Sequence, residues 1–176
     1  MGQWDNLFAF RDAAMRDDVA AMRELLARDS SFIAEENPND LPLDYLAKTY
    51  QLHTAAREGP LERVRQLIEQ DPRLIRQPWT SQGWLPLSQA VWGNQLETVR
   101  LLLSQGACAD DRIAEGGGTV LQMAAELDRI EMARLMIAAG ADPRARAPDG
   151  ASPIVNAKSE EMRETLTRGR GEAAGG

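Results

Sequence analysis

The stretch LHTAAREGPLERVRQLI, residues 52–68, contains the pattern that decides the fold. An alanine pair is followed by a Gly-Pro turn and then by Val64, Leu67 and Ile68. The i, i+3, i+4 spacing of these three aliphatic side chains places them on one face of a helix. We therefore expect two short antiparallel helices joined by a tight turn, the second of which has one apolar face.

An alanine position recurs along the chain at a nearly constant period. The aligned residues are Ala55, Ala90, Ala124 and Ala157, and their spacings are 35, 34 and 33 residues. An earlier copy at Ala13 precedes Ala55 by 42 residues. A fixed period of this size is typical of repeat proteins, in which each unit is too small to bury its apolar face alone and must stack on its neighbours.

Five such units result from this register. We expect one domain over residues 1–168, with a flexible tail over 169–176. The predicted units cover residues 5–30, 50–76, 83–110, 117–144 and 150–168. A long connection, 31–49, separates the first two units. Its sequence is compatible with a lid over a groove, an extended turn that reaches a partner, or a spacer.

The predicted helix ends carry suitable residues. Gly106 and Gly140 follow the second helices of the third and fourth units, where a left-handed residue is favoured. Thr119 and Ser152 precede first helices and are candidate N-caps. The residue types at the helix ends therefore agree with the helices that the periodicity predicts.

These motifs resemble those of the ankyrin-repeat family. A unit of that family has a turn with Gly, then Thr-Pro-Leu-His, an Ala pair, a Gly, a Glu-x-Val and a Leu-Leu pair that ends in Gly-Ala. The matching residues in the three central units are His53, Ala55, Ala56, Gly59, Glu62 and Val64; Pro86, Leu87, Ala90, Glu97, Val99, Leu102, Leu103, Gly106 and Ala107; and Thr119, Leu121, Ala124, Ala125, Glu131, Gly140, Ala141 and Asp142. The resemblance covers about residues 7–168 and implies an all-α solenoid.

The terminal units depart from the family pattern. Asp17 stands where the family has Gly, and the second helix of the fifth unit is shortened to about residues 161–166. Both terminal units carry many charged residues. A solenoid needs end units with one polar outer face, so we interpret these two units as caps.

Composition excludes several classes of protein. Of the 176 residues, 43% are hydrophobic and 27% charged, which is typical of a folded globular protein. The net charge of −7 and the absence of a basic stripe argue against nucleic-acid binding. No apolar stretch approaches the roughly 20 residues that cross a bilayer, and the acidic residue near the start, with no apolar region after it, leads us to expect no secretory signal. We expect a cytoplasmic monomer.

Few residues could perform catalysis or hold a metal. The single Cys108 cannot form an internal disulfide or a thiolate cage, and the single His53 disfavours mechanisms that need two imidazoles. By the resemblance, the His53 imidazole hydrogen-bonds backbone groups of the adjoining turn. The acidic residues within 35–44 and 110–115 lack the Gly and terminal Glu of a calcium loop. We expect no catalytic residue, metal or cofactor.

The resemblance also implies a recognition surface along a concave face. In the family it comprises the turn tips, the residue before the Thr-Pro start and the two residues after the Ala pair. On this chain the corresponding residues are Ser81, Gln82, Trp84 and Trp92 in the third unit, Arg57 and Glu58 in the second, and Glu126 and Leu127 in the fourth. Exposed indoles are common anchors of protein interfaces. The surface therefore predicts a protein partner, unless the indoles pack against a neighbouring unit or the long connection.

A different function could use the same groove. Its indoles could hold a small apolar ligand, or acids such as Glu58 and Glu126 could catalyse a reaction beside Trp92. A closed pocket over Trp92, roofed by the long connection and containing a carboxyl group, would favour this alternative. An open groove would favour protein binding.

Overall fold

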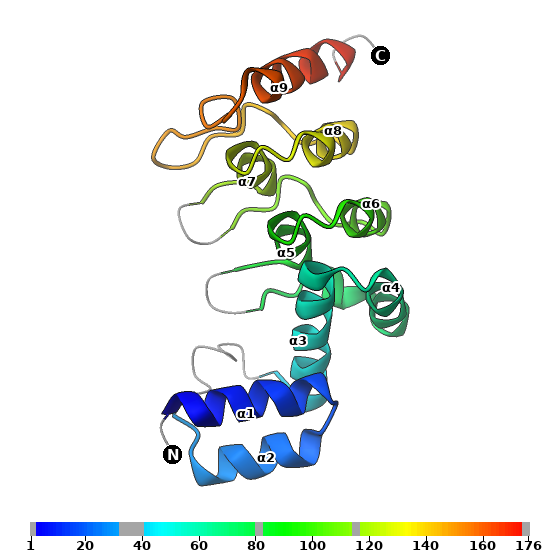
Figure 1. The fold of residues 1–176 in the computed structure, drawn as a ribbon, viewed down its shortest axis with the longest axis vertical. Helices are drawn as coiled ribbons and strands as arrows, with labels where there is room; N and C mark the ends of the chain where they lie inside the picture. The colour runs from blue at the N-terminus through cyan, green and yellow to red at the C-terminus, as the bar shows by residue number, and fades with distance from the viewer. Residues whose placement is uncertain (1–2, 32–40, 80–82, 114–116, 174–176) are drawn as a thin grey trace.

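Pairs of antiparallel helices stack in one row from the N-terminus to the C-terminus (Figure 1). This computed structural model describes residues 3–31, 41–79, 83–113 and 117–173. The helices are α1 (Gln3–Met15), α2 (Val19–Arg28), α3 (Leu43–Glu58), α4 (Leu61–Gln70), the 3₁₀ helix η1 (Pro72–Arg76), α5 (Pro86–Trp92), α6 (Leu96–Ser104), α7 (Val120–Glu126), α8 (Ile130–Ala138) and α9 (Glu160–Ala173). The described residues form no β-sheet beyond one isolated bridge. The predicted all-α solenoid is confirmed.

The predicted register places the small and aliphatic residues in the core. Ala90 and Ala124 are completely buried, where α5 lies between α3 and α7. Val64, Val99 and Ala133 are completely buried on the second helices of their units. Because neighbouring units contribute to one continuous apolar cluster from α3 to α9, each unit depends on the next for its burial.

A left-handed residue follows the first helix of four units and turns the chain back. Asp17, Gly59, Asn94 and Asp128 have φ angles of 58°, 93°, 59° and 57°. Asp and Asn tolerate this conformation better than other side chains do, which explains why Asp17 can replace the expected Gly. At Gly59 a Cβ atom would lie 2.2 Å from Oε1 of Gln95, so the Gln95 amide would have to move to admit a side chain.

The predicted caps at the helix ends are mostly present. Gly106 and Gly140 both have φ of 95° after the second helices. The Thr119 hydroxyl accepts a hydrogen bond from the Gln122 N–H at 3.2 Å and caps α7. Ser152 makes the corresponding contact at 3.4 Å, but the chain after it forms a turn rather than a helix.

The start of α3 corrects the predicted connection. The helix begins at Leu43, inside the segment 31–49 that we expected to connect two units. Leu46, Ala47 and Tyr50 on its first half are buried against α1, where the Tyr50 ring meets Phe10 edge-on at 6.4 Å. Packing on α1 therefore extends this helix beyond the repeat pattern.

The C-terminal unit also differs from its prediction. Its second helix, α9, continues to Ala173, so it is longer than predicted and includes the start of the expected tail. The Ser159 hydroxyl accepts from the Met162 N–H at 3.1 Å and donates to Asp128 Oδ1 at 2.6 Å, which fixes the beginning of α9. Met162 and Leu166 are completely buried, so α9 covers the end of the core against α8.

Candidate functional site

Two tryptophans of the third unit form one wall of a surface pocket. Trp84 precedes α5, and Trp92 is the last residue of that helix. Their rings meet edge-on with centroids 6.1 Å apart and an interplanar angle of 83°. Trp84 is half-buried against the core, whereas 48% of Trp92 is exposed. One indole therefore supports the other, and the outer indole remains open to solvent.

Local structure explains how α5 presents this pair. Pro86 occupies the first turn of α5, where a missing N–H costs nothing. Ser88 closes that turn by accepting from the Leu85 N–H at 3.0 Å. At the other end Gly93 passes so close to Arg57 that a Cβ atom would lie 1.9 Å from the Arg57 carbonyl oxygen. This contact holds the end of α5, and with it Trp92, against the preceding unit.

The pocket next to the indoles, which we call the tryptophan pocket, has a volume of about 280 Å³. Beyond the two indoles, its wall comes from Ile113 ahead of the fourth unit, from the fourth unit itself and from the turn that follows it. The lining residues are Trp84, Trp92, Ile113, Gly118, Thr119, Gln122, Met123, Glu126, Leu127 and Asp149. The wall is therefore partly apolar and contains two carboxyl groups.

Hydrogen bonds hold the Glu126 carboxylate in place at this wall. Its Oε1 atom accepts from Nε2 of Gln122 at 3.0 Å and from Nδ2 of Asn156 at 2.5 Å. A carboxylate only accepts hydrogen bonds, so the Gln122 amide must turn its NH₂ group toward Glu126. Oε1 of Gln122 is then buried, with no partner among the residues that the structure describes. Asp149 accepts from the Ala151 N–H at 2.9 Å.

The structure brings four of the predicted recognition residues together. Trp84, Trp92, Glu126 and Leu127 all line the tryptophan pocket. Their role in binding stays a prediction. Sequence reasoning missed Asp149 at this wall, which lies in the turn of the fifth unit.

The other predicted recognition residues are elsewhere. Arg57 and Glu58 are exposed at the end of α3 and do not line the tryptophan pocket. The Arg57 carbonyl accepts from Gln95 Nε2 at 3.3 Å, which joins the second and third units. Ser81 and Gln82 lie outside the described residues.

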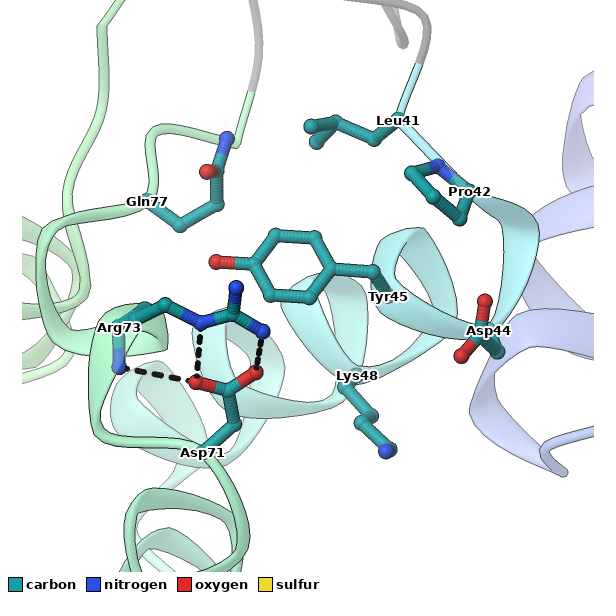
Figure 2. A pocket seen from close by; sticks show the side chains of 8 residues that line it. All are labelled: Leu41, Pro42, Asp44, Tyr45, Lys48, Asp71, Arg73 and Gln77. Carbon is teal, nitrogen blue, oxygen red and sulfur yellow. Dashed lines mark hydrogen bonds and ion pairs between the residues drawn. The ribbon is translucent and has the colours of Figure 1, made fainter.

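A second pocket, of about 470 Å³, lies between α3 and η1 (Figure 2). Arg73 forms a two-pronged ion pair with Asp71, with Nε···Oδ1 at 2.9 Å and Nη2···Oδ2 at 2.6 Å. Its guanidinium carbon also lies 5.4 Å from the centre of the Tyr45 ring. Hydrogen bonds from Arg73 lower the pKa of Asp71, and burial together with the Asp71 charge raises the pKa of Tyr45.

This second pocket has no net charge that would select a ligand. Asp44 and Asp71 line it together with Lys48 and Arg73, so its formal charges cancel. Figure 2 shows the Tyr45 hydroxyl directed toward the side formed by Arg73 and Gln77. Asp71 also caps η1 by accepting from the Arg73 backbone N–H at 3.1 Å. These contacts connect η1 to α3, so their clear role is structural.

His53 has the structural role that the resemblance implied. Its side chain is completely buried, and Nε2 bonds to the Gln77 carbonyl at 2.8 Å. Because a carbonyl only accepts, Nε2 carries the proton. Burial lowers the pKa of His53 to about 4, so the imidazole is neutral at pH 7. The Trp79 ring packs against the imidazole at 5.6 Å between centroids, and neither side chain lines the tryptophan pocket.

The other residues considered for chemistry have ordinary partners. Asp110 accepts from the Asp142 N–H at 2.9 Å, and Asp111 pairs with Arg76 at 2.8 Å. Cys108 is a free, half-buried thiol. Among the described residues, no three His, Cys, Asp or Glu side chains form a group that could hold a metal ion.

Stacked helix pairs with a 33- to 35-residue period and a pocket spanning several units define a repeat solenoid. Residues 52–147 match the family model described as ankyrin repeats in three copies, and the chain belongs to this family. Ankyrin repeats generally mediate protein–protein interactions, and they are generally not catalytic. Within the described residues, no helix is both long and apolar enough to cross a membrane.

Two larger proteins are similar to this chain. The palmitoyltransferase Hip14 of Drosophila melanogaster is 32% identical over 127 residues, which are 72% of this chain and 20% of Hip14. The ankyrin repeat and KH domain-containing protein mask-1 of Caenorhabditis elegans is 31% identical over 118 residues, which are 62% of this chain and 4% of mask-1. The chain thus spans a small part of either relative, and its match to Hip14 covers the repeat region.

Proposed function

We propose that this chain is a non-enzymatic interaction module that binds a protein partner at the tryptophan pocket. The observation that carries this proposal is the half-exposed Trp92 supported by Trp84. An indole with one face packed and the other in water gains free energy when a partner covers it, and tryptophan is enriched among the residues that dominate interface energies.

The free energy available from Trp92 is large enough to matter for affinity. About half of the side chain is exposed, which corresponds to roughly 100 Å² of mostly apolar surface. At about 20 cal/mol per Å², the lower end of the usual range, covering this surface contributes about 2 kcal/mol. That is roughly a 30-fold difference in the dissociation constant.

The remaining predicted residues extend the interface along the concave face of the row. Glu126 and Leu127 adjoin the indoles within the pocket. Arg57 and Glu58, exposed on the preceding unit, add mixed charge on one flank. We further propose, from the sequence pattern alone, that Ser81 and Gln82 take part at the turn tip, and that the module acts as a cytoplasmic monomer.

The geometry favours this function over a small-ligand or catalytic groove. The volume of about 280 Å³ is at or below the lower end of the roughly 300–1,000 Å³ typical of small-molecule sites. No described residue of the long connection lines the tryptophan pocket. Glu126 is held by two amide hydrogen bonds, and Glu58 lies outside the pocket. Asp149, the second carboxyl group at the wall, accepts from the Ala151 N–H within its own turn, so both carboxylates of the pocket are already engaged.

Selection from a display library of random peptides tests the proposal. Wild-type chain and the Trp92→Ala variant are immobilised in parallel, after their thermal midpoints have been shown to agree. We expect peptides that bind the wild type and lose roughly 30-fold in affinity for the variant. Peptides that bind both equally, or a library that yields no binder, would overturn the proposal.

A further inference from the structure

We propose that the tryptophan pocket receives an arginine side chain of the partner. This inference rests on the proposed function and adds the chemistry of the group that is bound. It depends on the aromatic surface that the pocket offers, on the sign of the charge at its wall and on its size.

The aromatic wall suits a planar cation. Trp92 is 48% exposed, and Trp84 meets its ring edge-on at 6.1 Å, which restricts how the indole can turn. The face of an indole attracts a cation through its quadrupole, and tryptophan is the best of the aromatic residues for this contact. A guanidinium can lie flat on the ring, whereas an ammonium group acts as a point charge.

The polar groups at the wall are acceptors. The two ionisable side chains that line the pocket are Glu126 and Asp149, and no described basic side chain lines it. The amides of Gln122 and Asn156 both donate to Oε1 of Glu126. Oε2 is therefore the atom to which an incoming N–H can donate. Oε1 of Gln122 is a further acceptor that lies buried behind this wall, and it has no partner in the described part of the chain.

A guanidinium beside the pocket, that of Arg112, is already engaged. Arg112 donates from Nη1 to the Gly117 carbonyl at 2.5 Å and from Nη1 and Nη2 to the Arg146 carbonyl at 3.1 Å. It brackets the turn beside the pocket and does not line it. The negative charge at the wall thus has no basic partner there among the described residues.

The size of the pocket points to one side chain. A volume of about 280 Å³ is small for a drug-sized molecule, and the wall combines apolar contacts from Met123 and Leu127 with the carboxylates. An arginine matches both parts, because its methylene stem is apolar and its head donates several hydrogen bonds in a fixed plane.

The direct test is a titration with three peptides that differ at one position. Acetylated and amidated Gly-Gly-Xaa-Gly-Gly is prepared with arginine, citrulline or lysine at Xaa. The readout is the set of indole N–H resonances in the full chain, assigned with the Trp84→Phe and Trp92→Phe variants. Citrulline keeps the shape and removes the charge, so it isolates the electrostatic contribution.

We expect the arginine peptide to shift the Trp84 and Trp92 resonances in a saturable manner. The citrulline peptide should bind at least fivefold more weakly, and the lysine peptide should lie between the two. Glu126→Gln, which retains the amide hydrogen bonds, should weaken arginine binding at least fivefold. Glu69→Gln, which makes the same change of charge at an exposed position on α4, should leave it unchanged.

Equal binding of the arginine and citrulline peptides, or equal binding by wild type and Glu126→Gln, would overturn the inference. Lysine binding as tight as arginine binding would overturn the choice of a guanidinium. The display selection distinguishes a failure of the arginine inference from a failure of the proposed function. Selected peptides that require Trp92 but show no enrichment in arginine would refute this inference and leave the interaction module standing.

Discussion

Replacing Gly93 by alanine tests how the units are held together. Gly93 follows α5 with φ −72° and ψ −3°, a conformation that any residue adopts. On local grounds alone, Gly93→Ala should stabilise the chain by about 0.5–1 kcal/mol, because alanine loses less backbone entropy. The surroundings of this glycine predict instead that the substitution destabilises the chain.

The new Cβ atom would meet three backbone atoms of Arg57. It would lie 1.9 Å from the carbonyl oxygen of Arg57, 2.7 Å from its carbonyl carbon and 2.9 Å from its Cα. Backbone cannot turn aside as a flexible side chain does, so the second and third units must separate locally. Overpacking of this kind costs about 1–3 kcal/mol or more. After the local gain is subtracted, we expect a net loss of about 2 kcal/mol.

Urea unfolding followed by far-ultraviolet circular dichroism measures this loss. The matched control is Gly106→Ala, because its φ of 95° strains an alanine while no atom lies within 4 Å of the new Cβ. That strain costs about 1–2 kcal/mol. A Gly93→Ala variant as stable as wild type, or more stable, would refute the close approach of the two units.

Three further predictions concern the core, the last helix and the buried imidazole. Ala90→Glu places an unpaired charge in a fully buried site, so it should cost about 3–5 kcal/mol and abolish the cooperative thermal transition; an unchanged thermal midpoint would contradict the register. Ser159→Ala removes the N-cap of α9 and the hydrogen bond to Asp128, so it should lower stability by about 1 kcal/mol. A loss of less than a few tenths of a kcal/mol, measured by urea unfolding, would argue against the cap. In the folded chain the pKa of His53 is about 4, which is below the unfolded value of about 6.5. The contribution of the neutral imidazole to folding stability is therefore complete above pH 6.5 and is lost as the pH falls toward 4. The loss of stability amounts to roughly 3 kcal/mol, so the stability of His53→Gln should depend less on pH than that of wild type over this range. If urea unfolding gives both proteins the same pH dependence, the lowered pKa of His53 is excluded.

The repeat pattern predicted most of the fold because spacing along the chain determines which side chains share a face. Val64, Leu67 and Ile68 are buried together, as their spacing requires. The start of α3 could not be predicted in this way. Residues 43–50 belong to no repeated motif, and their helix is stabilised by contacts with α1, which lies far away in sequence.

The candidate site was predictable in part for the same reason. Trp84, Trp92, Glu126 and Leu127 stand at positions that the family pattern assigns to its recognition surface. Asp149 was not identified because it belongs to the unit that departs most from the pattern. The Asn156 amide that holds Glu126 lies in a turn where a helix was expected. Its contact with Glu126 joins residues that are 30 positions apart in sequence, which local spacing does not encode.

The length of α3 has a consequence for local opening. Its first half belongs to the apolar cluster shared with α1 and α2, and its second half to the cluster that runs on to α9. Fraying of α1 and α2 can therefore expose one cluster while the other stays closed. Amide hydrogen exchange should show two levels of protection, lower in α1 and α2 and higher in α5. The change from the lower to the higher level should occur within α3.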